Sequence, residues 1–283
     1  MSDTLSSRML VNVLGIPGIL LCIYFGNEIF LGFIFVVSIL AMMEYFKLSE
    51  QKSISPQYVI SCLSAFIILM FYYVSDLSQI YTIPLGQFFV LIVGITLITE
   101  LFRNKPNPSL NIAVSLFGIF YIPLLLGALI GIREFFPLQS DLNMKLTFSL
   151  FIAVWLCDSA AYTFGKLWGK KKILERVSPK KTVVGAVSGL ITAIMVYLAF
   201  IKFRFIVSSD PTFSISYSDA VMMGIIVGVF GQMGDFIESM FKREVCVKDT
   251  SRILGGHGGV LDRFDSLLIA SPLIYLYLKF IID

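Results

Sequence analysis

Nine long apolar runs are the feature that most restricts how this chain can fold. An α-helix needs about 20 mostly apolar residues to cross the roughly 30 Å hydrocarbon core of a bilayer. The composition agrees, since 57% of the residues are hydrophobic and 14% are charged, against about a quarter charged in soluble domains. We therefore predict an all-α polytopic integral membrane protein with about nine transmembrane helices. The expected spans are 9–26, 28–45, 57–74, 84–102, 111–132, 146–164, 184–200, 217–240 and 264–282.

The first two runs are separated only by Gly26, Asn27 and Glu28. They are compatible with a tight helical hairpin or with a partly re-entrant pair, and we predict two spans. The seven residues before Arg8 include an acid and no basic residue, and no small-residue cleavage site follows. We therefore expect the first run to be a retained span rather than a cleaved signal peptide.

The basic residues indicate the orientation. If nine spans alternate, 17 of the 22 lysines and arginines fall on one side and five on the other. The positive-inside rule then places the N-terminus in the cytoplasm and the C-terminus outside. Because these cations sit in short juxtamembrane loops, setting the topology is the default role of any one lysine. The net charge of +3 gives no reason to expect nucleic-acid binding.

The two halves of the chain differ in the length of their loops and in their expected roles. Residues 1–145 have short loops and are expected to form a scaffold of roughly five spans. Residues 146–283 contain the long cytoplasmic loops 165–183 and 241–263 and are expected to be the catalytic region. The cysteines give neither a disulfide framework nor a zinc-site spacing; they are Cys22, Cys62, Cys157 and Cys246.

Acids near one leaflet indicate where function lies, because an ionisable group at bilayer depth costs a few kcal/mol and persists when paired or functional. Asp158 lies about six residues before the expected end of its span. Asp235 and Glu238 share a helix face at i, i+3 spacing. Asp262 and Asp265 open the last span from the same side. An alternative for Asp262 is a helix N-cap, with Asp265 favourably placed in the helix dipole.

Two basic loops meet these acids at the same leaflet, GKLWGKKKILERVSPKKTVVG and KREVCVKDTSRILGGHGG. Glycine backbone N–H groups can approach a phosphate closely, and lysines and arginines neutralise it. Carboxylates beside such cations suggest a metal and nucleotide phosphate site. The stretch GKLWGKK is not a P-loop, because it has three residues between its glycines and Lys171 where Ser or Thr would stand.

At these residues the chain resembles a known family. The segment SMFKREVCVKDTSRILGGHGGVLDRFD, Ser239 to Asp265, resembles the signature of phosphatidate cytidylyltransferases, also called CDP-diacylglycerol synthases. GDxxES before it, DSAAYxxG from Asp158 and SPKKT from Ser178 resemble family motifs in the family's order. The resemblance covers residues 150–283, and the first half only by hydropathy.

One position departs from the family pattern. Val184 stands before Gly185 where the family usually has a glutamate. The role of that glutamate is then absent, or it is supplied by Glu175 or Glu238.

The resemblance implies transfer of a cytidylyl group from CTP to phosphatidate, giving CDP-diacylglycerol and pyrophosphate. It implies Mg²⁺ or Mn²⁺, with a second cation left open, and a homodimer. We expect the inner membrane of a bacterium, with the active site facing the cytoplasm. Two alternatives are a CTP-dependent enzyme acting on another membrane lipid or polyprenol, and an ion-coupled transporter. A transporter predicts acids spread through the membrane depth, whereas these acids gather at one face.

Individual roles follow for in-line attack of the lipid phosphate on the α-phosphorus of CTP. We predict Asp235 and Asp262 as ligands of the divalent ion, with Asp158, Asp249 and Asp265 as second choices. A phosphate monoester, with a second pKa of about 6, is largely dianionic near neutrality and needs no general base. We therefore predict phosphate binding or loop ordering for His257. The residues expected to bind the phosphates are Ser178, Lys180, Lys181, Thr182, Lys242, Arg243, Lys248, Gly258, Gly259 and Arg263.

Overall fold

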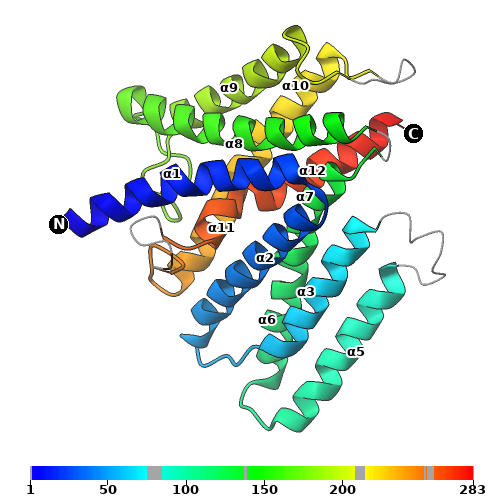
Figure 1. Ribbon diagram of the computed structural model, residues 1–283. Helices are drawn as coiled ribbons and strands as arrows, with labels where there is room; N and C mark the ends of the chain where they lie inside the picture. Colours follow the sequence, from blue (N-terminus) through cyan, green and yellow to red (C-terminus); the bar gives the residue numbers. More distant parts are fainter. Residues whose placement is uncertain are drawn as a thin grey trace. The chain divides into compact units, whose positions relative to one another are not determined.

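Figure 1 shows the computed structural model, which describes residues 2–74, 85–136, 139–207, 214–251, 253 and 258–282. Within these ranges the regular secondary structure is helical, apart from one isolated antiparallel bridge between Lys172 and Thr182. Each of the nine predicted apolar runs coincides with a helix or with consecutive helices. The predicted all-α architecture is thus confirmed.

Seven helices among the described residues are long and apolar enough to cross a membrane. Two further apolar helices, Val13–Phe25 and Tyr58–Tyr73, are shorter. The chain is therefore a polytopic helical membrane protein, while the number of nine crossings and the cytoplasmic N-terminus stay predictions.

The chain forms two compact units, and each is described by itself. Unit 1 contains Met1–Gly131 and Glu244–Arg263, and unit 2 contains Ile132–Arg243 and Phe264–Asp283. Most of the signature segment, from residue 244 to residue 263, therefore folds together with the first half of the chain.

Unit 1 is built on helices that are joined by short turns. α1 and α2 meet at Gly26, whose φ of 63° lies in the left-handed region that favours glycine. They are two separate helices, and the crossing of the membrane by each of them stays a prediction. Pro123 has no N–H to donate to the preceding turn, so the apolar rod from Pro108 to Arg133 is divided at Ile122 into α6 and α7. The helices of unit 1 are α1 (Ser2–Phe25), α2 (Asn27–Glu50), α3 (Tyr58–Tyr73), α5 (Leu85–Arg103), α6 (Pro108–Tyr121) and α7 (Pro123–Arg133).

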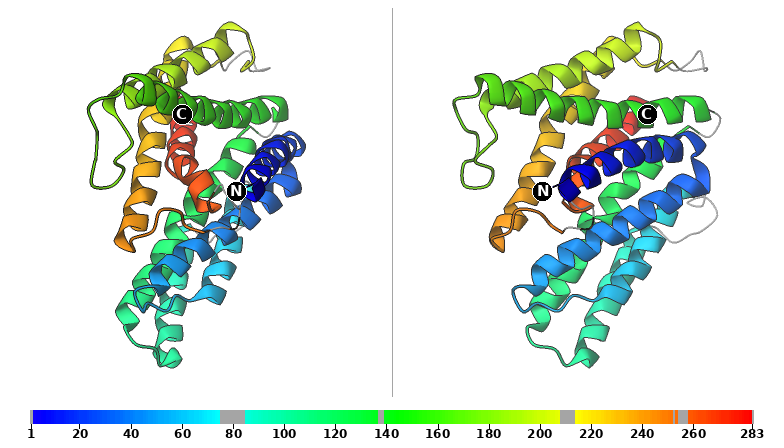
Figure 2. Two further views of the ribbon diagram at one scale, coloured as in Figure 1. Left: turned by 90° about the vertical axis from the view of Figure 1, so that its left-hand side faces the viewer. Right: turned by 60° about the vertical axis from the view of Figure 1, so that its left-hand side comes forward.

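Unit 2 places long helices against one another through small residues, as membrane helices commonly do. A Cβ on Gly185 would lie 2.6 Å from the Ala161 carbonyl oxygen, and one on Gly224 would lie 2.5 Å from Ile194 Cα. α9 is thus held against α8 on one side and α10 on the other (Figure 2). Two of its helices extend into unit 1, α11 with Glu244 and α12 with its first three residues. The helices are α8 (Ser140–Trp168), α9 (Val183–Lys202), α10 (Tyr217–Ile225), the π-helix η1 (Ile226–Gly231), α11 (Gln232–Glu244) and α12 (Leu261–Ile282).

The π-helix η1 interrupts the rod formed by α10 and α11. A π-turn leaves unpaired some backbone groups that an α-helix would pair. The side-chain amide of Gln232 donates to a backbone group of the π-helix, the Gly228 carbonyl. The same amide donates to the Ala186 carbonyl of α9 at 3.1 Å. Gln232 thereby ties the start of α11 to α9.

Candidate active site

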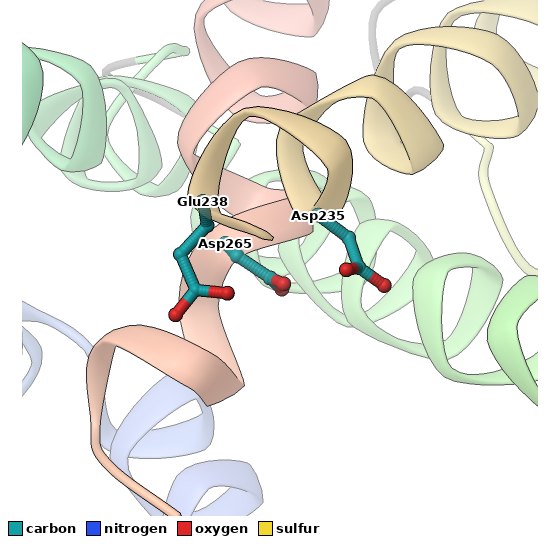
Figure 3. A group of neighbouring side chains, drawn as sticks. All are labelled: Asp235, Glu238 and Asp265. Atoms are coloured by element: carbon teal, nitrogen blue, oxygen red, sulfur yellow. The ribbon is translucent and has the colours of Figure 1, made fainter. Parts of the chain in front are cut away.

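Three carboxylates of unit 2 gather between α11 and α12. Asp235 and Glu238 project from α11, and Asp265 projects from α12 toward them (Figure 3). One carboxylate oxygen of each lies within 4.8 Å of one on each of the others. Glu238 and Asp265 are buried, whereas the Asp235 side chain is 34% exposed. Asp235 is therefore the acid of the three that a ligand can reach most easily.

Gly234 allows this approach of the two helices. A Cβ at this position would overlap the Asp265 carbonyl oxygen and would lie 3.1 Å from Ser266 Cα. The atoms it would meet belong to the backbone of α12, which cannot turn away as a flexible side chain can. The glycine before Asp235 in the GDxxES motif is thus explained by packing.

Two lysines neutralise part of the negative charge. Lys181 Nζ lies 2.5 Å from Asp235 Oδ2 and 4.3 Å from the centre of the Phe236 ring. Lys242 forms an ion pair with Glu238 one turn along α11, and both side chains are buried. The sequence predicted both lysines as phosphate-binding residues, and the structure brings each of them against an acid of the cluster.

The loop from residue 169 to 182 brings Lys181 to α11. It folds back on itself, since the Val183 amide donates to the Lys171 carbonyl and the Lys181 amide to the Ser178 carbonyl. The Arg243 Nε donates to the Val177 carbonyl at 3.1 Å. The loop is therefore held to α11 at Val177 as well as at Lys181.

Of the other predicted residues in this loop, one caps a helix and the rest are at least partly exposed. The Thr182 hydroxyl caps α9 by accepting from the Gly185 amide at 3.2 Å, and the residue is buried. Lys180 is exposed and Ser178 is partly buried. Val184 lines a shallow apolar groove between α8 and α9 together with Phe164 and Trp168. No acid thus occupies the position where the family usually has a glutamate.

Asp158 lies on α8, which is longer than predicted. The helix ends at Trp168, ten residues beyond Asp158, rather than near residue 164. The Asp158 side chain is exposed and is not a member of the three-acid cluster. It is close enough to Asp265 for the two carboxylates to interact electrostatically.

Asp262 belongs to unit 1, where it organises the turn before α12. Its Oδ2 accepts from the Gly259 amide at 2.8 Å and from the Thr250 amide and hydroxyl at 2.9 Å each. Gly258 has a φ of 81°, and a Cβ there would lie 2.7 Å from the same oxygen. Asp262 is the second residue of α12 and accepts from residues that precede the helix, so it is not the N-cap that the sequence offered as an alternative. Its role as a metal ligand stays a prediction.

A second carboxylate reaches this turn from α2. Glu44 is fully buried. Its Oε1 accepts from the Ser251 hydroxyl at 2.6 Å and the Val260 amide at 2.9 Å. Its Oε2 accepts from the Thr250 hydroxyl at 2.9 Å and the Leu261 amide at 2.8 Å. The first half of the chain thus supplies a side chain to the signature loop.

Glu44 is not among the residues predicted from the sequence, although its signal is present there. Glu44 is an acid inside the apolar run 28–45, which is the same observation that singled out Asp158 and Asp235. Glu238 was recognised by its spacing to Asp235 but was not predicted as a ligand. An acid within an apolar run is the signal that Glu44 and Glu238 have in common.

The remaining predicted residues lie in or beside the unit 1 loop. Lys248, Asp249 and Arg263 are exposed. Gly259 is buried, and a Cβ there would overlap Thr250 Oγ1 and Glu44 Oε2. His257 lies outside the described residues, so its predicted role is untested.

Comparison with known proteins gives one consistent result. The family model described as "Cytidylyltransferase family" matches residues 6–281. A phosphatidate cytidylyltransferase of Staphylococcus haemolyticus (strain JCSC1435) is 31% identical over 271 residues, covering 96% of this chain and 98% of the relative. A protein of the same name from Staphylococcus saprophyticus subsp. saprophyticus is 34% identical over 257 residues, covering 89% of this chain and 91% of the relative.

Proposed function

Because the chain belongs to the cytidylyltransferase family, we propose that it transfers a cytidylyl group from CTP to phosphatidate. The products are CDP-diacylglycerol and pyrophosphate. The name and coverage of the relatives support the choice of phosphatidate. The observation that carries the proposal is the cluster of Asp235, Glu238 and Asp265, with Lys181 and Lys242 paired to it. Acids and ammonium groups at one point suit a triphosphate and its counterion.

The donor set of the cluster fits a hard divalent cation. Carboxylate oxygens are the ligands that Mg²⁺ and Mn²⁺ prefer, and three of them come within 4.8 Å of one another. Asp235, Glu238 and Asp265 would hold the ion. When bound, the ion withdraws charge from the phosphate oxygens and the leaving group. Asp262 as an additional ligand, and a second cation, stay predictions.

The chain's own residues bind and orient the two phosphate-bearing substrates. Lys181 and Lys242 carry ammonium groups beside the acids, and they can exchange a carboxylate for a phosphate oxygen because both are charge-assisted partners. A lipid phosphate oxygen then forms a bond to the α-phosphorus while the bond to the bridging β-phosphate oxygen breaks. Pyrophosphate leaves with the electron pair, and no proton has to be removed from a dianionic nucleophile.

The site of action follows from the substrates. A diacyl lipid lies in the bilayer and CTP is soluble, so the reaction needs a site at a membrane surface. Seven membrane-length helices and bacterial relatives support a bacterial inner membrane. The excess of lysines and arginines on one side favours an active site that faces the cytoplasm. The homodimer implied by the resemblance belongs to the same proposal, and crosslinking in native membranes tests it.

Turnover by the purified protein tests the proposal directly. With CTP, Mg²⁺ and phosphatidate in detergent, we expect stoichiometric release of pyrophosphate and formation of CDP-diacylglycerol. The absence of release, or equal release without phosphatidate, would refute it. Asp235→Asn should abolish turnover with folding retained.

An acceptor series separates the proposal from its near alternative. Phosphatidate is compared with a polyprenyl phosphate and with diacylglycerol at equal mole fraction in the micelle. We expect phosphatidate to give the highest kcat/KM. A higher value for the polyprenyl phosphate would keep the cytidylyl chemistry and replace the acceptor.

A further inference from the structure

We propose that Glu44, in the first half of the chain, is a positioning residue for the signature loop. It acts through Thr250 and the start of α12 on Asp262. The catalytic consequence rests on the proposed function, whereas the structural consequence can be measured without it. All the residues involved belong to unit 1.

Glu44 connects two parts of the loop that are ten residues apart in sequence. It accepts from Thr250 and Ser251 at one end and from Val260 and Leu261 at the other. Each carboxylate oxygen receives one hydroxyl and one backbone N–H. Leu261 is the first residue of α12 and Val260 directly precedes it. N–H groups at a helix start lack helical acceptors, and the helix dipole there favours an anion. A buried carboxylate is thus stabilised by the residues that it orders.

Thr250 links Glu44 to Asp262. Its hydroxyl oxygen lies 2.9 Å from Glu44 Oε2 and 2.9 Å from Asp262 Oδ2. The hydroxyl has one hydrogen and can donate it to only one of the two carboxylates at a time. The two carboxylates therefore compete for it, and a change in one alters the hydrogen bonding of the other. The Thr250 amide also donates to Asp262. A change at Glu44 is therefore transmitted to Asp262 through one residue.

Gly259 shows how tightly the turn is packed around Glu44. A Cβ at this position would overlap both Thr250 Oγ1 and Glu44 Oε2. The second glycine of the final pair in GGHGG is thus required by contact with Glu44 and Thr250, independently of any phosphate.

Replacing Glu44 by glutamine tests these hydrogen bonds directly. Hydroxyl groups can rotate to accept from an amide NH₂, but the backbone N–H groups of Val260 and Leu261 cannot. In either orientation the glutamine NH₂ faces one of these N–H groups. Glu44→Gln therefore keeps the size of the side chain while it disrupts the start of α12.

Glu100→Gln is the matched control. Glu100 is a buried acid of α5 in the same unit and accepts from Gln57, Arg103 and Asn111. None of these partners belongs to the signature loop. The control measures what the loss of a buried carboxylate costs the unit in general.

The experiment combines steady-state kinetics with hydrogen exchange in detergent. We expect Glu44→Gln to lower kcat/KM for CTP about 10- to 100-fold, the usual effect of removing a residue that orients a functional group. Backbone amides in the peptide covering residues 245–262 should exchange faster than in the wild type. Glu100→Gln should leave both unchanged at a comparable loss of thermal stability.

Thr250→Val provides a second variant if Glu44→Gln does not fold. It removes only the shared hydroxyl and should change activity and exchange in the same direction. Unchanged exchange at 245–262 in both variants would overturn the proposal, as would equal activity losses in Glu44→Gln and Glu100→Gln. If the wild type transfers no cytidylyl group, the proposed function fails, and the exchange result still decides the role of Glu44.

Discussion

Replacing Gly234 by alanine tests whether the close contact of α11 and α12 builds the acid cluster. A Cβ on Gly234 would lie 3.0 Å from the Asp265 carbonyl carbon and 3.1 Å from Ser266 Cα, and closer still to the Asp265 carbonyl oxygen. Ordinary van der Waals contact begins near 3.4 Å. Relief of the contact with the carbonyl oxygen needs a backbone displacement on the order of 1 Å, which is beyond the roughly 0.5 Å tolerance of a functional site.

Two opposing energies set the expected stability change. Overpacking costs about 1–3 kcal/mol, while alanine in a helix is favoured over glycine by about 1 kcal/mol. Gly234→Ala should therefore lose about 0–2 kcal/mol. Gly94→Ala on α5 is the control, because no atom lies within 4 Å of the Cβ it would add. It should be neutral or gain up to about 1 kcal/mol.

Thermal unfolding in detergent and titration with Mn²⁺ measure the two effects. We expect the displaced Asp265 to weaken Mn²⁺ binding about 10-fold or more in Gly234→Ala, with no change in Gly94→Ala. Equal unfolding temperatures and equal Mn²⁺ affinities in the two variants would refute the reasoning.

Three further substitutions test the separate roles of Asp262, Lys181 and Lys242. Asp262→Asn should abolish turnover while the fold is retained, because the amide oxygen can still accept from the Gly259 and Thr250 N–H groups; an active variant would leave Asp262 with the ordering of the turn before α12 alone. Lys181→Met should lower kcat/KM for CTP about 10- to 100-fold, the worth of a hydrogen bond to a charged group. Lys170→Met should not, since Lys170 makes none of the described ion pairs, and equal losses would remove Lys181 from the site. Lys242→Met should cost about 3–5 kcal/mol by leaving Glu238 without its buried ion-pair partner. Adding Glu238→Leu should restore most of this stability, and a double variant as unstable as the single one would contradict that explanation.

The apolar runs predicted the helices well because a helix long enough to cross a membrane can be recognised from its composition alone. Their ends were less accurate. α8 continues from residue 146 back to Ser140 and from residue 164 on to Trp168, since hydropathy marks the apolar part of a helix and not the helix itself. Polar residues such as Asp141 and Lys166 continue the helix beyond that part.

The candidate site was predictable where it depends on spacing along one helix. Asp235 and Glu238 share a face, as their i, i+3 separation predicted. The approach of Asp265 depends on Gly234, and the pairing of Lys181 with Asp235 depends on how the loop 169–182 folds back. These are tertiary contacts, and no local pattern specifies them.

The contribution of the first half was the least predictable part. Glu44 lies more than 200 residues before its partners Thr250 and Leu261. A single intramembrane acid indicates that a partner exists, but it does not indicate which one.

The assignment of residues 244–263 to unit 1 has a consequence for dissecting the protein. The chain passes from unit 2 to unit 1 at Arg243 and Glu244 and returns at Arg263 and Phe264. A fragment starting at residue 132 would contain the complete signature segment. It would lack Glu44, the side chain that accepts hydrogen bonds from both ends of the signature loop. We therefore expect separately expressed halves to regain the native loop only when they are produced together, and we expect a fragment that holds the whole signature to be inactive on its own.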